Sequence, residues 1–251
     1  MDRAGAGRHG ASVLSLVIPA YNEARRLPAS LVCCADHLRA RGLAAEIIVA
    51  DDGSTDGTAL AYSTTVAGLA EDGLTFRYLP LAHAGKGSAV RAGVLQATGD
   101  PIIFLDADLS IPVALVDRFL EALDAGADIA IASRYVPGSR VRRPLVRRLM
   151  GSAYRAFVRA LVPTGLQDTQ CGGKAYTARA ARALFSRQRL NGFAFDAEVL
   201  YLARRAGLRV TEVPVALAQS AETSIDLLRD APRMLADLVR IRAGAVLGRY
   251  R

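Results

Sequence analysis

Short apolar runs alternate with longer amphipathic segments through the first half of the chain. Five runs rich in Val, Ile and Leu have the pattern of buried parallel strands, at 13–18, 46–50, 74–79, 101–105 and 128–132. Helical spacing of apolar positions follows the first four runs, at 29–41, 56–70, 87–97 and 112–124. Such alternation predicts an α/β fold with a Rossmann-like, doubly wound, mostly parallel sheet and helices on both faces.

The regular alternation ends after Ser133. Beyond it the pattern predicts a helix from Pro144 onward, a turn rich in Gly, Thr and Gln over 167–174, helices at 178–185 and 195–205, and a strand over 209–217. We expect three parts: a disordered tail (1–12), one α/β domain (13–223) and a C-terminal extension (224–251) that forms a basic amphipathic helix.

Composition and length exclude several classes of protein. Because 51% of the 251 residues are apolar and 22% are charged, the chain can bury a core and is not intrinsically disordered. Its three cysteines fit neither a disulfide scaffold nor a zinc pattern. No stretch approaches the ~18 apolar residues of a membrane span, and residues 1–10 lack the apolar run of a secretory signal. We therefore expect a cytoplasmic protein.

The basic residues are distributed unevenly. Only Lys86 and Lys174 are lysines among 32 basic residues, and the formal net charge is +8. Residues 134–167 hold eight Arg and no acid, which is typical of a surface for phosphate and anionic lipid. A solvated helix face is the alternative. A nucleic-acid partner is not expected, since the segment has few aromatic residues and no recognisable nucleic-acid module.

Two loops that leave predicted strands carry paired carboxylates. Asp106 and Asp108 follow the run 101–105, and residues two apart in extended chain point to the same side. Two such carboxylates suit Mg²⁺ or Mn²⁺ bound to diphosphate oxygens, although a solvated turn before the helix at Pro112 would also explain them. Asp51 and Asp52 follow the run 46–50, and their carboxylate oxygens could accept hydrogen bonds from a ribose hydroxyl or a base edge.

Further loop residues bear on nucleotide binding. Pro19 ends the first apolar run, Tyr21 could lie against a nucleobase, and Glu23 could accept a hydrogen bond from it. Gly85-Lys86-Gly87 lacks the spacing of a P-loop, and no GxGxxG motif is present. The sequence therefore supports neither P-loop ATP hydrolysis nor dinucleotide redox chemistry.

Together these segments resemble the family-2 glycosyltransferases of the GT-A fold. The segments are VIPAYNE at 17–23, VADDGSTDGT at 49–58, GKG at 85–87 and DAD at 106–108. Further segments resemble the polyprenyl-phosphate sugar synthases, above all the dolichyl-phosphate glucosyltransferase branch: ASRY at 132–135, QDTQCG at 167–172, FDAE at 195–198 and EVPV at 212–215. Gly173 departs from that branch, which usually has an aromatic residue there, and Leu109-Ser110 is equally similar to the mannosyl branch.

The resemblance implies roles for particular residues. The nucleotide-sugar would contact Pro19, Tyr21, Glu23, Asp51, Asp52, Lys86, Asp106, Ala107, Asp168 and Gln170. The metal would be held by Asp106 and Asp108, helped by Ser110, and the acceptor phosphate by Arg134, Arg148 and Ser152. Asp196, Arg134 and Asp108 would be the catalytic residues.

The role of Asp196 depends on the acceptor. A phosphomonoester is mostly dianionic at neutral pH, because its second pKa is about 6, and it needs no base. Asp196 would then orient an Arg or Lys174, or cap the helix that ends at Arg205. With a hydroxyl acceptor it would be the general base.

The resemblance implies a metal-dependent, inverting transfer of glucose from UDP-glucose to a polyprenyl phosphate, at the inner face of the cell membrane. Contact with anionic lipid would be peripheral. Two alternatives remain: a GDP-mannose-dependent enzyme acting on the same class of lipid, or a non-catalytic module that binds nucleotide-sugar or lipid phosphate. The oligomeric state is left open.

Overall fold

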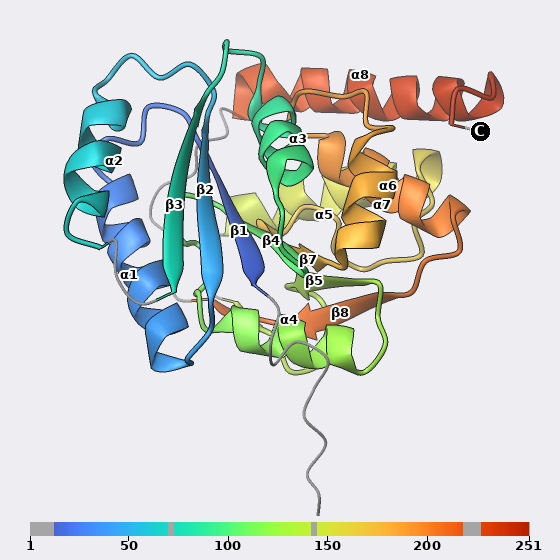
Figure 1. Ribbon diagram of the computed structural model, residues 1–251. Coiled ribbons are helices and arrows are strands. Elements are labelled where there is room, and N and C mark those ends of the chain that lie inside the picture. Colours follow the sequence, from blue (N-terminus) through green and yellow to red (C-terminus); the bar gives the residue numbers. More distant parts are fainter. Residues whose placement is uncertain (1–12, 70–72, 142–144, 218–226, 251) are drawn as a thin grey trace, which may run out of the picture.

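The computed structural model describes residues 13–69, 73–141, 145–217 and 227–250, with the backbone alone at 145–149 and 227–229 (Figure 1). Its centre is a seven-stranded sheet with the strand order β3-β2-β1-β4-β7-β5-β8. The strands are β1 (Leu14–Ala20), β2 (Ala45–Asp51), β3 (Leu74–Pro80), β4 (Ile102–Leu105), β5 (Ile129–Ser133), β7 (Gly173–Tyr176) and β8 (Val210–Pro214). The predicted doubly wound, mostly parallel sheet is therefore confirmed.

The helices begin and end close to the predicted positions. They are α1 (Leu27–Ala40), α2 (Thr58–Val66), α3 (Lys86–Gln96), α4 (Leu115–Asp124), α5 (Leu145–Leu161), α6 (Ala178–Phe185), α7 (Phe195–Arg205) and α8 (Leu227–Val246). Among the helices of the first half, the largest difference is at α2, which is shorter than the predicted 56–70.

The turn predicted over 167–174 is wrong at its end, because residues 173–176 form β7. This strand runs antiparallel between β4 and β5, with Gly173 opposite Leu105 and Lys174 opposite Phe104. It has four residues and includes a glycine and a lysine, so it leaves no apolar run in the sequence. The strand predicted over 209–217 is also divided. Val215 separates β8 from β9 (Ala216–Leu217), which pairs with β6 (Arg140–Val141) in a small second sheet.

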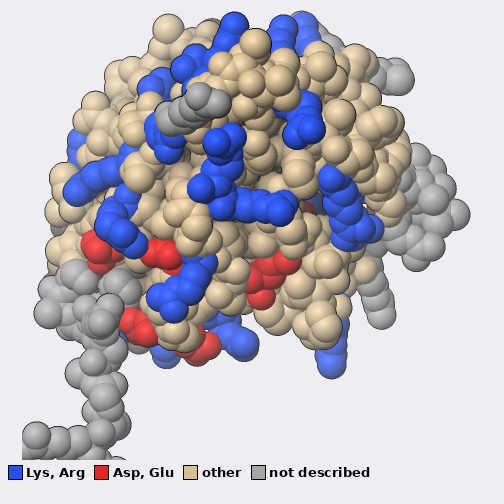
Figure 2. Space-filling model, turned by 90° about the vertical axis from the view of Figure 1, so that its right-hand side faces the viewer, with Lys and Arg blue, Asp and Glu red and all other residues tan. Residues whose placement is uncertain are grey.

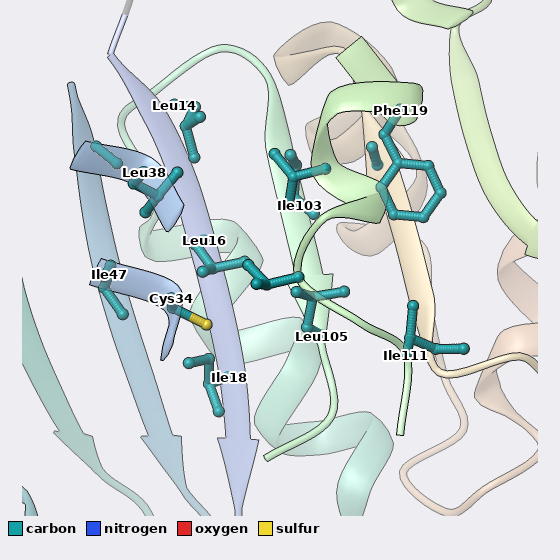
Figure 3. Packing of buried hydrophobic residues seen from close by; sticks show 14 of the residues in the cluster. Leu14, Leu16, Ile18, Cys34, Leu38, Ile47, Ile103, Leu105, Ile111 and Phe119 are labelled. Atoms are coloured by element: carbon teal, nitrogen blue, oxygen red, sulfur yellow. The ribbon is translucent and has the colours of Figure 1, made fainter. Parts of the chain in front are cut away.

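Two hydrophobic clusters cover the two faces of the large sheet. Alternate residues of β1, Leu16 and Ile18, pack with α1, α2 and α4 on one face (Figure 3). Val17, between them, packs on the other face with α3 and α5 to α8. Residues that alternate along a strand point to opposite faces, so a continuous apolar run is what a sheet covered on both sides requires.

The C-terminal helix packs on the domain. Leu238 and Ile241 of α8 are fully buried beside α5 and α7. Beyond the helix, Tyr250 donates a hydrogen bond of 2.7 Å from Oη to the buried Glu198. The predicted helix within 224–251 is thus observed over 227–246, whereas the division expected at 223/224 lies outside the described residues. Within the described ranges, no helix is long and apolar enough to cross a membrane.

Candidate active site

Most of the predicted site residues lie in loops at one edge of the large sheet or at the strand ends beside them, whereas Lys86, Arg148, Ser152 and Asp196 lie in helices. Strands β1 to β5 run parallel, so the loops that leave their carboxyl ends gather there. Because β7 runs in the opposite direction, the loop before it, residues 167–172, arrives at this same edge. The antiparallel strand therefore brings the predicted Asp168 and Gln170 to the loops of the first half.

Tyr21 and Glu23 follow β1 and differ in their surroundings. The Tyr21 side chain is 47% exposed and its ring stacks on the His83 ring, with centroids 4.4 Å apart. Glu23 is buried and receives two hydrogen bonds from the Arg26 guanidinium, at 2.6 and 2.7 Å. Pro19 lies within β1, opposite Ala50, so the strand runs one residue beyond it. Tyr21 is thus accessible to a ligand, while the Glu23 carboxylate already has a cationic partner.

Asp51 and Asp52 at the end of β2 accept hydrogen bonds from their own loop, from β3 and from the loop after β3. Asp51 accepts hydrogen bonds from the Ser54 amide at 3.2 Å and the Tyr78 hydroxyl at 2.5 Å. Asp52 accepts from the Ala84 amide at 2.8 Å and the Gly85 amide at 2.9 Å. Both carboxylates therefore hold the shape of the site.

The two predicted metal-binding carboxylates follow β4. Asp106 Oδ1 lies 2.5 Å from Lys86 Nζ, and Asp108 Oδ1 accepts a hydrogen bond of 2.9 Å from the Ser110 amide. Burial lowers the pKa of Lys86, but Asp106, Asp196 and Asp108 raise it more, so the net shift is upward. Lys86 thus carries a positive charge among three carboxylates.

The residues around Asp106 fit a divalent cation. Carboxylate oxygens are the hard ligands that Mg²⁺ and Mn²⁺ prefer. A Cβ built on Gly172 would overlap the Asp106 carboxylate, so a larger residue here would displace that carboxylate from its present position. Within the described ranges, no three His, Cys, Asp or Glu side chains gather into a metal site. Metal bound between Asp106 and Asp108 would therefore take further oxygen ligands from a substrate, as an open catalytic site requires.

Backbone conformation is unusual in two of the site loops. Asn22 and Leu109 are the non-glycine residues with positive φ in the described structure, at 55° and 44°. Asn tolerates this region, whereas Leu has no polar side-chain group to compensate for it and is strained. Asn22 Oδ1 accepts a hydrogen bond from the Thr55 amide at 2.9 Å, which joins the loops after β1 and β2. The strain at Leu109 lies directly after Asp108.

The glycines beside Lys86 allow a close approach of the chain. A Cβ on Gly85 would lie 2.6 Å from the Asn191 carbonyl oxygen, and one on Gly87 would lie 2.7 Å from Phe195 Cβ. Since real Cβ atoms do not come so close to other atoms, both positions require glycine. The GKG segment thereby packs α3 against the start of α7, where Asp196 lies.

Asp196 forms a buried ion pair. Its Oδ1 lies 2.6 Å from Nζ of Lys174, and Lys174 is completely buried in β7. The ammonium also donates a hydrogen bond of 2.7 Å to the Cys171 carbonyl oxygen. Burial raises the pKa of Asp196, although Lys174 and Lys86 oppose the shift. The negative charge of Asp196 therefore depends on the two lysines.

Arg134 and Asp168 form a second ion pair. The Arg134 guanidinium donates two hydrogen bonds to the Asp168 carboxylate, at 2.6 and 2.8 Å, and the Arg134 amide donates a third. Burial raises the pKa of Asp168, but Arg134 lowers it more, so the carboxyl is ionised. Glu212 of β8 accepts hydrogen bonds from the amides of Gln167 and Asp168. Arg134, directly after β5, and Glu212, within β8, thus hold the loop before β7.

Helix α5 lies beside this pair. The Arg155 guanidinium carbon is 3.6 Å from the centre of the Tyr135 ring, and that of Arg134 is 5.8 Å from it. Ser152, predicted to face the acceptor, is partly buried one turn before Arg155. The side chain of Arg148 lies outside the described residues. Residues 148, 152 and 155 recur at the spacing of one helix face.

Three residues of this site were not singled out by the sequence patterns. Gly172 makes room for Asp106. Arg155 shares its helical spacing with the two predicted α5 residues, a signal present in the sequence. Tyr154 carries a buried hydroxyl to which no described group hydrogen-bonds, and burial, Asp196 and Asp237 raise its pKa. Only the packing of α5 on α7 and α8 brings Tyr154 to this place.

Solved structures with this fold belong to GT-A glycosyltransferases. Glucosyl-3-phosphoglycerate synthase from Mycobacterium tuberculosis in complex with UDP superposes with a TM-score of 0.68 at 22% identity, over 93% of this chain and 81% of that one. A complex of the same enzyme with Mn²⁺, UDP-glucose and phosphoglyceric acid gives a TM-score of 0.63 at 19% identity, over 96% and 80%. The fold is that of a GT-A glycosyltransferase.

Sequence similarity then defines the family. The model described as glycosyl transferase family 2 matches residues 15–190, and the chain belongs to this family of enzymes. The dolichyl-phosphate β-glucosyltransferase of Dictyostelium discoideum is 32% identical, over 94% of this chain and 75% of the relative. That of Saccharomyces cerevisiae is 30% identical, over 95% and 76%. Glycosyltransferase AglD of Haloferax volcanii is 33% identical, over 90% of this chain but 36% of the relative.

Proposed function

We propose that this protein is a metal-dependent, inverting glycosyltransferase that moves glucose from UDP-glucose to a polyprenyl phosphate. The observation that carries the proposal is that charged groups of both halves of the chain act on one another at one edge of the sheet. The negative charges of Asp106, Asp108 and Asp196 together raise the pKa of Lys86. The similarity to dolichyl-phosphate β-glucosyltransferases over most of the chain supports the choice of sugar and acceptor.

On the donor side, we propose that the nucleobase lies against Tyr21 and near Asp52, and that the diphosphate lies near Lys86 and Asp106. The exposure of Tyr21 and the partial exposure of the Lys86–Asp106 pair support this proposal. Asp51, Glu23 and Pro19 would shape the loops around the nucleoside, and the backbone of Ala107 would be anchored through its carbonyl oxygen, which accepts a hydrogen bond from Ser30 at 2.6 Å.

Asp106 and Asp108, with Ser110 beside them, would hold the divalent cation. When bound, such a cation supplies positive charge to the diphosphate leaving group. Lys86 would add a further positive charge at the same place, where the charge of the leaving group increases during the reaction. Solved relatives of this fold contain Mn²⁺ or Mg²⁺ together with UDP, which supports the choice of metal.

On the acceptor side, we propose that the phosphate approaches α5 and is held by Arg148, Ser152 and Arg155. Arg155 is stacked on Tyr135 and has no carboxylate partner among the described residues, so its N–H groups remain free to bind an anion. Arg134 would contribute its positive charge beside them while its guanidinium stays bound to Asp168. Gln170 and Asp168 would lie near the sugar. The phosphate oxygen would attack the anomeric carbon as the bond to the diphosphate breaks, which inverts the configuration.

Asp196 would orient Lys174 in this reaction. A dianionic phosphate needs no general base, and the carboxylate already has an ammonium at 2.6 Å. The fixed Lys174 would in turn support the loop that contains Cys171, because it donates to that carbonyl oxygen. This role requires no proton transfer to Asp196.

We further propose peripheral contact with anionic lipid at the inner face of the cell membrane. Lys and Arg dominate the charged surface of the face in Figure 2, on the side of α6, α7 and the end of α8. Exposed apolar side chains of α8 and of the residue after it include Val239, Val246 and Leu247. Basic and apolar side chains presented together suit the headgroup region of a bilayer.

The test is a panel of labelled donors against one short polyprenyl phosphate, with chloroform-extractable label as the readout. UDP-glucose should give extractable label that depends on both the lipid and a divalent metal, whereas UDP-galactose and UDP-GlcNAc should give little. Transfer from GDP-mannose instead would show that the sugar is mannose and the donor GDP-mannose. Nucleotide binding without transfer from any donor would favour the non-catalytic module.

A further inference from the structure

His83 contacts both residues that the proposed function assigns to the nucleobase. Its ring stacks on Tyr21 with an interplanar angle of 25° and a centroid distance of 4.4 Å. Its Nδ1 atom lies 2.9 Å from Asp52 Oδ2 and 3.0 Å from the Asp52 carbonyl oxygen. These three residues follow β1, β2 and β3, three neighbouring strands of the sheet.

The Asp52 carboxylate is closely surrounded in this arrangement. Oδ1 accepts from the amides of Ala84 and Gly85, Oδ2 accepts from the amide of Gly85, and His83 Nδ1 lies 2.9 Å from Oδ2. A donor group of a ligand that bonded to Oδ2 would therefore have to displace the imidazole. Since both partners of His83 Nδ1 are acceptors, this nitrogen carries the proton.

We infer that His83 occupies the position of the nucleobase when no donor is bound, and that it thereby sets the affinity for the donor nucleotide. The imidazole is a flat ring that stacks on Tyr21 and an N–H donor to Asp52. A nucleobase that contacted these two residues would need the face of the Tyr21 ring on which His83 stacks and the Asp52 oxygen beside which His83 Nδ1 lies. The inference rests on the proposed function, because it assumes that the base binds there.

The geometry allows His83 to leave without unfolding the loop. Its side chain is 57% exposed, so rotation about the Cα–Cβ bond moves the ring into solvent. The backbone of the loop stays in place, because the amides of Ala84 and Gly85 donate to Asp52 independently of the imidazole. A ligand that binds only the open arrangement has its apparent affinity reduced by the fraction of molecules that are closed.

The first experiment is a calorimetric titration of the full chain with UDP in the presence of Mg²⁺. His83→Ala should lower the Kd by about 3- to 10-fold, the range expected for loss of one aromatic contact and its hydrogen bond. His83→Phe keeps a stacked ring and removes the donor, and should give a smaller decrease. Tyr21→Ala should raise the Kd. His37→Ala is the matched control, since His37 faces Asp117 on α4 and should leave the Kd unchanged.

The second experiment observes the His83 ring directly by proton NMR, which is practical because the chain has three histidines. In the free protein the Tyr21 ring should shield the imidazole protons, and Tyr21→Ala should abolish this shift. Saturating UDP should move the His83 signals to the positions of an exposed histidine. Continued shielding with UDP bound would mean that His83 is a fixed wall of the site, which overturns the inference.

An unchanged or higher Kd in His83→Ala also overturns the inference. It leaves the proposed function intact if the wild type still transfers sugar to polyprenyl phosphate. Absence of UDP binding to both the wild type and His83→Ala, together with absence of transfer, would instead overturn both proposals.

Discussion

The two lysines of this chain form ion pairs of almost equal length in very different surroundings. The donor half of the site consists of the loops after β1 to β4 and the start of α3, and there Lys86 lies 2.5 Å from Asp106, with side chains 22% and 24% exposed. The acceptor half consists of α5, the loops after β5 and before β7, β7 itself and the start of α7, and there Lys174 lies 2.6 Å from Asp196, with side chains 0% and 7% exposed. Water and a ligand can reach the first pair, whereas the second is enclosed by the protein. The first is therefore suited to binding, and the second to holding the structure.

The same difference extends to the other carboxylates of the site. In the donor half, Asp52 is held largely by backbone amides of the next loop. In the acceptor half, Asp168 is held chiefly by the guanidinium of Arg134. Removal of one member of a buried ion pair leaves an uncompensated charge, so the acceptor half should be more sensitive to single substitutions.

The largest expected effect is on stability, at the buried lysine. Lys174→Met should lower the free energy of unfolding by about 3–5 kcal/mol, the usual result when one partner of a buried ion pair is removed. Urea unfolding followed by circular dichroism measures this change. Lys86→Met is the matched control, and the exposure of its pair predicts a loss of under ~1 kcal/mol. Equal losses would contradict the comparison.

The next effect is on turnover, in the donor half. Asp108→Ala should lower kcat by roughly 10²- to 10³-fold, as expected when one group that stabilises developing charge is removed. The partly exposed Asp108 should have little effect on stability. Initial rates at saturating Mg²⁺ and an unfolding curve of the same sample measure both. Turnover unchanged in this variant would exclude a role for Asp108 in metal binding.

A third effect concerns Glu46, a buried carboxylate in β2 that lies outside the site. Burial raises its pKa, but hydrogen bonds from Ser15, Thr98 and Arg77 bring it down to about 2 from the ordinary 4.5. A lowered pKa in the folded state contributes stability above pH 4.5, and this contribution is lost as the pH falls towards 2. The shift corresponds to roughly 3 kcal/mol at neutral pH.

Glu46→Gln should therefore lose up to that amount at pH 7, and the difference from the wild type should shrink as the pH falls from 4.5 towards 2. Urea midpoints measured across this range test the prediction. A constant difference at all pH values would mean that the amide loses packing rather than charge.

The smallest expected effect separates two arginines of α5. Arg155→Ala should raise the KM for polyprenyl phosphate by about 10-fold, the loss of one charge-assisted contact, with the KM for the donor unchanged. Arg159→Ala is the control on the same helix, because Arg159 is exposed and hydrogen-bonds to Gln167. Similar increases in both variants would show a diffuse effect of charge rather than a specific contact.

The position of the donor half was predictable because it follows from local rules. Apolar runs define buried parallel strands, and the loops at their carboxyl ends necessarily meet. The strands β1 to β5 and the helices between them accordingly begin and end near the predicted residues, and Tyr21, Asp52 and Asp106 share one edge of the sheet. The acceptor half was less predictable, since β7 has no apolar run and is held in the sheet by its neighbours.

The sequence by itself determined the parallel strands of the sheet, the family and most of the candidate residues, because hydrophobic periodicity and loop position are properties of short segments. Only the tertiary structure decided which charges are paired. The reversed direction of β7 places Lys174 beside Asp196, and the loop before β7 places Asp168 beside Arg134. Ion pairs depend on distances of a few ångströms between residues far apart in the chain, and such distances are fixed only when the strands and helices pack.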